Sequence, residues 1–426
     1  MKYFGTDGIR GVYGEFLTDE LAYRAGLATG AAKGKGLYII GCDTRPSCPA
    51  LLKAYSDGLI NAGCDVMYAG ILPTPAVSYL TVKYRAKCGV MISASHNPPE
   101  YNGIKIFNGQ GIKLTEEEEE AVESRIGKPA KVLDKGRYKQ SPDAADEYSA
   151  HIVSLFKDCD FKGIRVVLDC ANGAAGAAAP KIFKELGFGV GAYNCGLDKG
   201  GFINDGVGAL YPEAVMSYMK NEAFGLSFDG DADRLSIMCG GAVLDGDSVI
   251  YNLSKAMPLK DETVVGTVLN NLALEQALNK DGKKLVRTPV GDKYIADEML
   301  RNGYGIGGEQ SGHYIIRPCG PTGDGIAAAL FFIKSLLDGK GKVKEPCRLE
   351  LCPQGAISEP AKPSILENAG FKALVEKYTA ELKGTGRLVT RMSGTEPKVR
   401  VMAECQNAET VKNILSIFKT YIQSVQ

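Results

Sequence analysis

Residues 224–234 read FGLSFDGDADR, an apolar run that ends directly in three alternating aspartates. The run Phe224–Phe228 is typical of a buried β-strand. Asp229, Asp231 and Asp233 follow at every second position, so their carboxylates can converge on one hard cation such as Mg²⁺. The alternative is a solvated acidic turn, in which the three negative charges would repel one another. Because α/β sheets bind ligands beyond the carboxyl ends of their strands, this segment indicates an α/β domain with a site at its edge.

Apolar, β-rich runs alternate with helical patterns on both sides of this segment. Further strands are predicted at 36–42, 164–169 and 263–269, and helices at 49–62, 115–126, 178–186, 272–278 and 325–337. This alternation is typical of α/β domains. The run of glutamates at 116–120 is interpreted as the acidic first turns of a helix capped by Thr115, which suits the helix dipole.

Three stretches interrupt the alternation and predict domain boundaries. Residues 128–142 are charged and carry a proline, 239–246 are rich in glycine, and 339–363 are rich in Gly, Lys and Pro. With roughly 100–200 residues per domain, a chain of 426 residues has room for four. The predicted domains are 1–142, 143–241, 242–345 and 346–426. The first three share the α/β pattern, and the short last one is expected to be α+β.

The charge balance and the apolar runs exclude several classes of partner. Fifty basic residues offset fifty acidic ones, so no global charge attracts nucleic acid or an anionic membrane. The N-terminus lacks the apolar core of a signal peptide, and the longest apolar run, 326–333, is far short of the ~20 residues that cross a bilayer. The twelve cysteines form no CxxC pair, so we expect reduced, mostly buried thiols. A cytoplasmic enzyme without nucleic-acid or membrane partners is expected.

A second polar loop, SASHNP at 93–98, follows the apolar run 89–92. Ser95 is a candidate nucleophile there, and the alternative is a turn held by side-chain-to-backbone hydrogen bonds. Ser95 and His96 are neighbours in sequence, so their side chains are expected to diverge. A hydrolytic Ser–His pair is therefore not expected.

Two further loops have the composition of a sugar-phosphate site. In GGEQSGH, 307–313, Glu309 and Ser311 could bond neighbouring hydroxyls of a polyol, or the loop could be a plain glycine turn. In RMSGTEP, 391–397, a guanidinium, two hydroxyls and a glycine could cradle phosphate, with Arg400 close behind; the alternative is a hairpin turn with surface arginines. Two basic residues could reach the same site, Lys293 in TPVGDK and Arg10 in the opening GTDGIRG. The alternatives are a solvated surface lysine for Lys293 and a glycine-rich start to a domain for the opening segment.

In this order and at this spacing, the loops resemble those of the α-D-phosphohexomutase family over essentially the whole chain. The resemblance implies four domains around a central cleft, three similar mixed α/β domains and a smaller C-terminal α+β domain like the TATA-box-binding-protein fold. It implies interconversion of hexose 6-phosphate and hexose 1-phosphate through a phosphoserine and a hexose 1,6-bisphosphate, which also acts as activator. The GTDGIRG opening, Gln310 and the SASHNP loop favour glucosamine phosphate over glucose or mannose phosphate. A Mg²⁺-dependent phosphohydrolase is the more distant alternative.

The resemblance also implies a role for each matching residue. Ser95 would carry the phosphoryl group, and one of its phosphate oxygens would join Asp229, Asp231 and Asp233 around one Mg²⁺. Lys105 and His313 are the two candidates for proton transfer, with Arg10, His96 and Arg234 beside them. The phosphosugar would be bound by Lys293, Glu309, Ser311, Arg391, Ser393, Gly394, Thr395 and Arg400. Met392 stands where the family usually has proline, and Ala232 where glycine is common. The chain would act as a monomer or homodimer.

Overall fold

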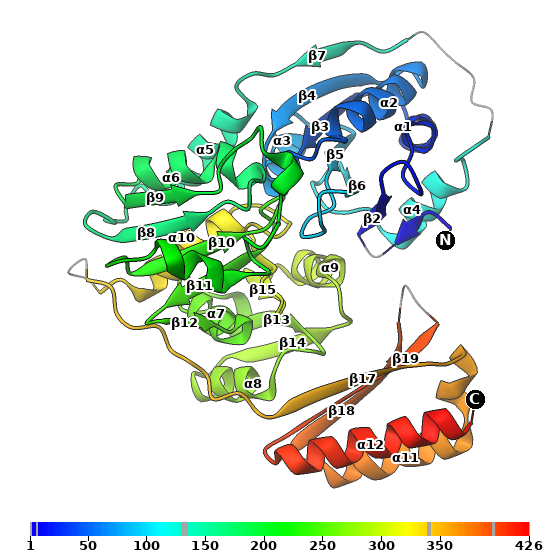
Figure 1. The fold of residues 1–426 in the computed structure, drawn as a ribbon, viewed down its shortest axis with the longest axis vertical. Coiled ribbons are helices and arrows are strands. Elements are labelled where there is room, and N and C mark those ends of the chain that lie inside the picture. Colours follow the sequence, from blue (N-terminus) through cyan, green and yellow to red (C-terminus); the bar gives the residue numbers. More distant parts are fainter. Residues whose placement is uncertain (1, 6, 129–134, 339–341, 394–396, 426) are drawn as a thin grey trace.

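The computed structural model describes the chain except residues 1, 6, 129–134, 339–341, 394–396 and 426 (Figure 1). The described residues form four β-sheets, one after another along the sequence. The predicted strands at 36–42, 164–169, 224–228 and 263–269 are all present, with ends that differ by at most two residues. The predicted fold class, three α/β domains followed by a smaller α+β domain, is confirmed. The predicted domain limits stay predictions.

The first sheet has seven strands. Their order is β1 (Phe4–Gly5), β2 (Gly8–Val12), β6 (Tyr101–Asn108), β5 (Cys88–Ile92), β3 (Leu37–Cys42), β4 (Asp65–Ile71) and β7 (Tyr138–Gln140). Successive residues of a strand face opposite sides. Accordingly Tyr38 and Ile40 pack with α1 (Asp19–Lys33) and α2 (Cys48–Asn61), whereas Ile39 packs with α3 (Thr74–Lys83). Strand β5 delivers the 93–98 loop at its carboxyl end.

The acidic helix α4 (Glu116–Glu123) confirms the predicted cap. The Thr115 hydroxyl accepts a hydrogen bond from the backbone N–H of Glu118, whose carboxylate accepts one from the N–H of Thr115. This reciprocal pair satisfies two N–H groups that would otherwise lack partners. The helix packs against α1.

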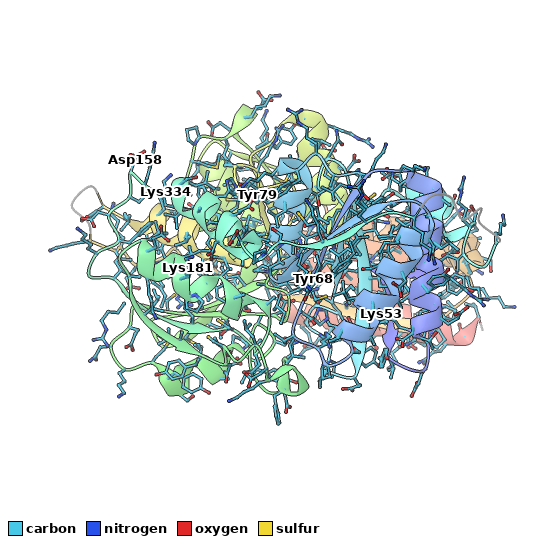
Figure 2. All side chains as sticks on the ribbon, turned by 90° about the horizontal axis from the view of Figure 1, so that it is seen from above. Lys53, Tyr68, Tyr79, Asp158, Lys181 and Lys334 are labelled. Carbon is cyan, nitrogen blue, oxygen red and sulfur yellow. The ribbon has the colours of Figure 1, made fainter. Side chains whose placement is uncertain are left out.

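The second sheet follows the order β12 (Ala242–Leu244), β11 (Leu235–Cys239), β10 (Phe224–Phe228), β8 (Arg165–Asp169) and β9 (Gly189–Tyr193). Strand β8 is parallel to β9 and β10, and a hairpin then reverses the chain into β11. That hairpin holds the aspartate loop. Helices α5 (Ala144–Ser154) and α6 (Ala179–Glu185) pack on this sheet. Lys181 of α6, labelled in Figure 2, pairs with Asp146 of α5 at 2.7 Å.

The third sheet follows the order β14 (Lys284–Thr288), β13 (Thr263–Thr267), β15 (Ile306–Gly308) and β16 (Tyr314–Ile316). Its helices are α7 (Gly246–Leu253), α8 (Leu272–Lys280), α9 (Asp292–Asn302) and α10 (Gly325–Leu336). One apolar core runs without a break from α3 and α5 through the second sheet to α7 and α10. The first three domains therefore form one packed body. Tyr79 of α3, labelled in Figure 2, adds to this packing because its ring stacks on that of His151 of α5, with ring centroids 4.2 Å apart.

The C-terminal domain has its own apolar core. Antiparallel strands β17 (Gln354–Pro360), β19 (Lys398–Cys405) and β18 (Gly386–Met392) pack on α11 (Ala369–Glu381) and α12 (Ala408–Ser424). In Figure 1 this orange and red domain lies on the α8 side of the third domain. The buried carboxylate of Glu404 joins the two, because it accepts a hydrogen bond from the N–H of Leu272 (2.6 Å) and pairs with Arg387.

The twelve cysteines are free, and most are buried, as predicted. In the part of the chain that the structure describes, no helix has both the length and the apolar character that a membrane crossing needs.

Candidate active site

Ser95 lies at the end of β5, buried against the aspartate loop of the second domain. Its hydroxyl donates a hydrogen bond to Asp229 Oδ2 at 2.6 Å, and His96 Nδ1 lies 3.3 Å from the Ser95 hydroxyl oxygen. The expected divergence of Ser95 and His96 is therefore wrong. Ser95 has a backbone φ of +53°, a left-handed conformation that is uncommon outside glycine and turns the two side chains to the same side. The Ser95 proton nevertheless goes to Asp229, not to His96.

The carboxylates of Asp229, Asp231 and Asp233 are buried and converge, with one oxygen of each lying within 4.8 Å of the others. Burial and the charges of Asp233 and Asp231 raise the pKa of Asp229 to about 8. Asp231 Oδ1 and Asp233 Oδ1 are buried and accept no hydrogen bond from the described residues. Hard oxygen ligands with unused lone pairs, held together against their repulsion, fit a divalent cation of the Mg²⁺ type.

Two small residues let the aspartate loop take this shape. Gly230 lies so close to the 93–98 loop that a Cβ there would meet the carbonyl oxygen of Ser95 at 2.7 Å. Ala232 has a φ of +56°, a left-handed conformation that favours glycine. The loop is further tied by backbone bonds from Thr74 N to the Asp231 carbonyl (2.9 Å) and from Gly325 N to the Ala232 carbonyl (3.0 Å).

Lys105, on β6, supplies the main positive charge of the centre. Its ammonium lies 2.8 Å from Asp231, 3.0 Å from Asp233 and 3.2 Å from Asp7. Burial alone would lower the pKa of Lys105, but these three carboxylates raise it well above its usual range. Arg234 lies beside them, and the charges of Asp233 and Asp229 outweigh its burial and raise its pKa as well. The two cations offset most of the negative charge of the triad.

His313 brings the third domain to the same centre. A backbone bridge pairs it with Arg234, and Leu235 N donates to the Gly312 carbonyl at 2.9 Å. Nδ1 of His313 lies 3.7 Å from Asp233, and Nε2 of His313 lies 3.3 Å from Asp292. Burial opposes the charged imidazolium, but the charges of Asp292 and Asp233 raise the pKa of His313 to about 10.

Lys113 continues this network from the third domain back to the first. Its ammonium lies 2.7 Å from Asp292, on α9, and 2.5 Å from Asp7, which also pairs with Arg10. Sequence reasoning missed Asp7, Lys113 and Asp292. Asp7 and Asp292 stand inside GTDGIRG and TPVGDK, in which only the basic residues Arg10 and Lys293 were predicted to belong to the site. Acidic residues within those motifs were the available signal.

The remaining residues predicted for the first and third domains lie around this network. Arg10 Nη1 donates to Asn97 Oδ1 at 3.1 Å, and burial together with the charges of Arg234 and Arg10 lowers the pKa of His96 to about 4. Glu309 Oε1 accepts a hydrogen bond from Gly291 N at 3.2 Å, and burial raises its pKa.

Two of the predicted sugar-binding residues differ in what surrounds them. Ser311 is exposed. Lys293 is neither a free surface lysine nor bonded within its own loop, because its ammonium pairs with Glu116 (3.2 Å) and Glu119 (3.8 Å) of α4. The acidic helix thus has a contact across domains as well as a capped N-terminus.

Arg391 and Arg400 are directly opposite each other on β18 and β19. Opposite residues in an antiparallel pair project to the same face, and their neighbours Met392 and Val399 pack towards the helices, so the two guanidinium groups share the other face. Burial and the charge of Arg400 lower the pKa of Arg391. Two like charges held together make a site that an anion would stabilise. Ser393 closes the strand pair through its N–H (2.8 Å to the Lys398 carbonyl), whereas Gly394 and Thr395 lie outside the described residues.

Comparisons with known proteins agree with this arrangement of loops. Four family models for the domains of phosphoglucomutase/phosphomannomutase match the sequence. They are alpha/beta/alpha domain I at residues 1–132, domain II at 146–241, domain III at 245–350 and the C-terminal domain at 354–419. Phosphoglucosamine mutase of Clostridioides difficile is 40% identical, with 99% of each chain covered. That of Thermotoga maritima is 41% identical, with 100% of each covered. The chain belongs to the α-D-phosphohexomutase family. It is a phosphosugar mutase.

Solved structures show the same phosphohexomutase fold. A phosphoglucomutase/phosphomannomutase family protein from Burkholderia thailandensis has a TM-score of 0.77 at 23% identity, covering 99% of this chain and 97% of its own. N-acetylphosphoglucosamine mutase of Aspergillus fumigatus, solved in complex with GlcNAc-6P and magnesium, has a TM-score of 0.68 at 18% identity, covering 97% and 94%. At these identities the similarity concerns the fold alone.

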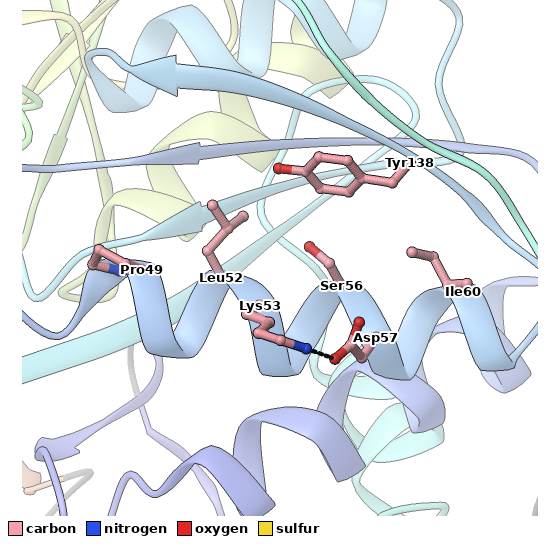
Figure 3. A pocket seen from close by; sticks show the side chains of 7 residues that line it. All are labelled: Pro49, Leu52, Lys53, Ser56, Asp57, Ile60 and Tyr138. Atoms are coloured by element: carbon pink, nitrogen blue, oxygen red, sulfur yellow. Dashed lines mark hydrogen bonds and ion pairs between the residues drawn. The ribbon is translucent and has the colours of Figure 1, made fainter.

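A separate cavity of about 330 Å³ lies between α2 and β7 of this phosphohexomutase (Figure 3). Leu52, Ile60 and Tyr138 line it, and Lys53 and Asp57 pair at 2.6 Å on its α2 side. It contains none of the residues that converge on the aspartate loop, so it is not the candidate active site.

Proposed function

We propose that this phosphohexomutase interconverts glucosamine 6-phosphate and glucosamine 1-phosphate, with Ser95 as the carrier of the phosphoryl group. The observation that carries the proposal is the Ser95 hydroxyl, 2.6 Å from a carboxylate of the buried aspartate triad. A serine used for hydrolysis would need a base to take its proton and an open path for water. Here the serine is almost fully buried among fixed charges, which suits a phosphoryl group that must be protected from water.

Asp229, Asp231 and Asp233, with an oxygen of phosphorylated Ser95, would hold one Mg²⁺. Their unused oxygens and their mutual proximity support this assignment. The bound cation would withdraw charge from the phosphoryl group and so favour its in-line transfer. Arg234 and Lys105 would stabilise the same negative charge from the protein side.

The sugar hydroxyl that attacks the phosphoryl group must lose a proton. Lys105 and His313 are proposed to transfer that proton, and both are held in place by carboxylates, Lys105 by Asp7 and His313 by Asp292. Because these carboxylates raise the pKa of both residues, the transferring residue starts protonated: it gives its proton to the departing Ser95 oxygen and regains one from the sugar hydroxyl. Arg10 and His96 lie at the rim of this group. A side chain fixed near the reacting oxygen accelerates proton transfer because no reorganisation precedes it.

The substrate's second phosphate would be held by Arg391, Ser393 and Arg400, and Gly394 and Thr395 are proposed to complete that loop. Glu309, Ser311 and Lys293 are proposed to bind the sugar. The first transfer yields a hexose 1,6-bisphosphate. This intermediate then reorients end over end in the site, so that Ser95 recovers the other phosphoryl group. Added hexose 1,6-bisphosphate would reload Ser95 and act as activator.

The choice of glucosamine phosphate rests on the full-length relatives, which are phosphoglucosamine mutases. The alternative is a phosphoglucomutase or phosphomannomutase activity in the same site. Turnover of glucosamine 6-phosphate should exceed that of glucose 1-phosphate and mannose 1-phosphate in a coupled assay with the matching 1,6-bisphosphate. A higher kcat/KM for either neutral sugar would reassign the substrate, and steady release of inorganic phosphate without isomerised product would indicate a phosphohydrolase.

Replacement of Ser95 with Ala should abolish mutase turnover, by at least about 10³-fold, because no other group can carry the phosphoryl group between the two transfers. The matched control is Ser56→Ala, another buried serine, on α2 beside the outer cavity. It should keep the activity of the unmodified protein. A Ser95→Ala variant with near-normal kcat would end the proposal.

A further inference from the structure

Arg45 is a fully buried arginine directly behind the Ser95 loop. It follows β3, and its side chain has no exposed surface. All five N–H groups of its guanidinium have an acceptor. Nε donates to Asp43 Oδ2 at 2.9 Å. The terminal nitrogens donate to four backbone carbonyls, those of Ser95 (2.9 Å), Asn97 (2.7 Å), Pro98 and Tyr101 (2.9 Å).

Asp43, the partner of Arg45, reaches the same loop from the other side. It accepts a hydrogen bond from the Ser93 hydroxyl at 2.7 Å, and that hydroxyl in turn accepts one from the N–H of Ser95 at 2.9 Å. The ion pair of Asp43 and Arg45 therefore holds both the N–H and the C=O of Ser95. Because it is neutral as a pair, it adds no net charge beside the aspartate triad.

Asn204 of the second domain completes the hold on the loop. Its side-chain amide donates to the carbonyls of Ser95 (2.9 Å) and Asn97 (3.0 Å), the same two oxygens that Arg45 Nη2 contacts. Ser95 sits in a left-handed conformation, which a serine keeps only when its surroundings enforce it. Four carbonyl oxygens turned towards one point would also repel one another without a cation among them.

We propose that Arg45 is a positioning residue for phosphoryl transfer, which fixes the Ser95 backbone so that its hydroxyl faces the aspartate triad. The inference rests on the proposed role of Ser95. Among the described residues, the hydrogen bonds and ion pair of the Arg45 side chain go to Asp43 and to loop carbonyls and not to the triad, so its effect passes through the loop backbone. Lysine cannot replace it, because an ammonium has three donors where the guanidinium uses five in a fixed plane.

The test compares Arg45→Lys with Arg287→Lys as the matched control. Arg287 is a half-buried arginine that also donates to two backbone carbonyls, of Thr267 and Asn270, and pairs with a carboxylate, but it lies in the third domain away from Ser95. Displacement of a reacting group by about 1 Å can cost about 10²-fold in rate. Arg45→Lys should therefore lower kcat about 10²-fold with KM within twofold of normal, while Arg287→Lys changes neither.

A second variant keeps the test decisive if Arg45→Lys does not fold. Asn204→Gly removes two donors to the loop, tolerates the φ of +59° at this position and leaves the buried ion pair intact. It should lower kcat about tenfold, again without a change in KM. A folded Arg45→Lys variant with normal kcat, or, where that variant does not fold, an Asn204→Gly variant with normal kcat, overturns the inference.

The outcome also separates this inference from the proposed function. If Ser95→Ala retains turnover, the role of Ser95 fails and the position of its loop has no bearing on the rate. If Ser95→Ala is inactive while Arg45→Lys is fully active, only the positioning role of Arg45 fails.

Discussion

The packed body formed by the first three domains differs from the C-terminal domain in how its charged side chains are paired. In the body, Lys105 lies within 3.2 Å of three carboxylates, and Lys113 joins Asp7 to Asp292. In the C-terminal domain, Arg391 and Arg400 face each other across β18 and β19, and no ion pair joins either to a carboxylate among the described residues. Among the described residues, the body therefore pairs its buried lysines with carboxylates, whereas Arg391 and Arg400 have no carboxylate partner.

This difference assigns separate tasks to the two regions. A network of side chains that ion pairs already hold in place is preorganised, so it can stabilise a transferring phosphoryl group without rearranging. Two arginines with no carboxylate partner among the described residues gain most when an anion binds, because charge-assisted hydrogen bonds then offset their mutual repulsion. The separate apolar core of the C-terminal domain lets the domain bind as a unit. Substitutions in the body should therefore lower kcat, and substitutions in the C-terminal domain should raise KM.

After Ser95→Ala, the largest effect is expected from Asp231→Asn in the body. Asp231 Oδ2 accepts hydrogen bonds from Thr74 (2.6 Å) and Lys105 (2.8 Å), while Oδ1 has no partner in the described chain. An asparagine can keep both bonds through its oxygen and place its amide at the unpaired position, so only the charge and the metal ligand are lost. We expect kcat to fall about 10²–10³-fold with little change in KM, and the Mg²⁺ concentration for half-activity to rise.

Asp324→Asn is the matched control for this variant. Asp324 is equally buried, but it caps α10 and lies outside the triad. Its replacement should leave kcat within a few-fold of normal and the Mg²⁺ dependence unchanged. Equal losses of kcat in the two variants would mean that the loss of any buried carboxylate lowers kcat. The assignment of a catalytic role to the triad would then fail.

Sequence patterns predicted those features of the two regions that are formed by residues close together in the chain. The strand Phe224–Phe228 and the aspartates after it were readable because a buried strand and its loop are continuous in the chain. The capped helix at Thr115 was readable for the same reason. Asp43, Arg45 and Asn204 were not found, since their importance depends on groups that lie 50 to 109 residues away along the chain. Arg391 and Arg400 were found as a cradle, but their direct opposition follows from strand register, which the sequence alone leaves open.

The next effect in size concerns the arginines of the C-terminal domain. Arg391→Ala and Arg400→Ala should each raise KM about 10- to 100-fold, because each removes a charge-assisted bond to the bound phosphate. Neither should lower the melting temperature of the free protein by much, since each also removes a like-charge repulsion. Arg301→Ala, on the exposed surface of α9, is the control and should change neither quantity. A fall in kcat at constant KM for both C-terminal variants would show that these arginines act in catalysis as the body does and not in substrate binding.

The smallest effect tests the stability of the packed body through pH. The helices α11 and α12 of the C-terminal domain are capped by neutral asparagines, Asn368 and Asn407, whereas α10 of the body is capped by the buried carboxylate of Asp324. Burial raises the pKa of Asp324 to about 6 from an ordinary value of 3.8. Tyr148 and the N–H of Ala327 hydrogen-bond to this carboxylate and only partly oppose the shift.

Between these two pKa values the folded chain keeps the Asp324 proton and the unfolded chain loses it, so stability falls as the pH rises. The contribution is fully present below the unfolded pKa and is lost as the pH passes the folded one. Relative to Asp324→Asn, the unmodified protein should lose about 2 kcal/mol of unfolding free energy between about pH 4 and pH 6. Urea unfolding of both proteins across this range measures the difference, and the other titrating groups cancel because both proteins share them. A constant difference between the two proteins over the range would show that the buried cap carries no such charge penalty, and the body would then resemble the C-terminal domain in this respect.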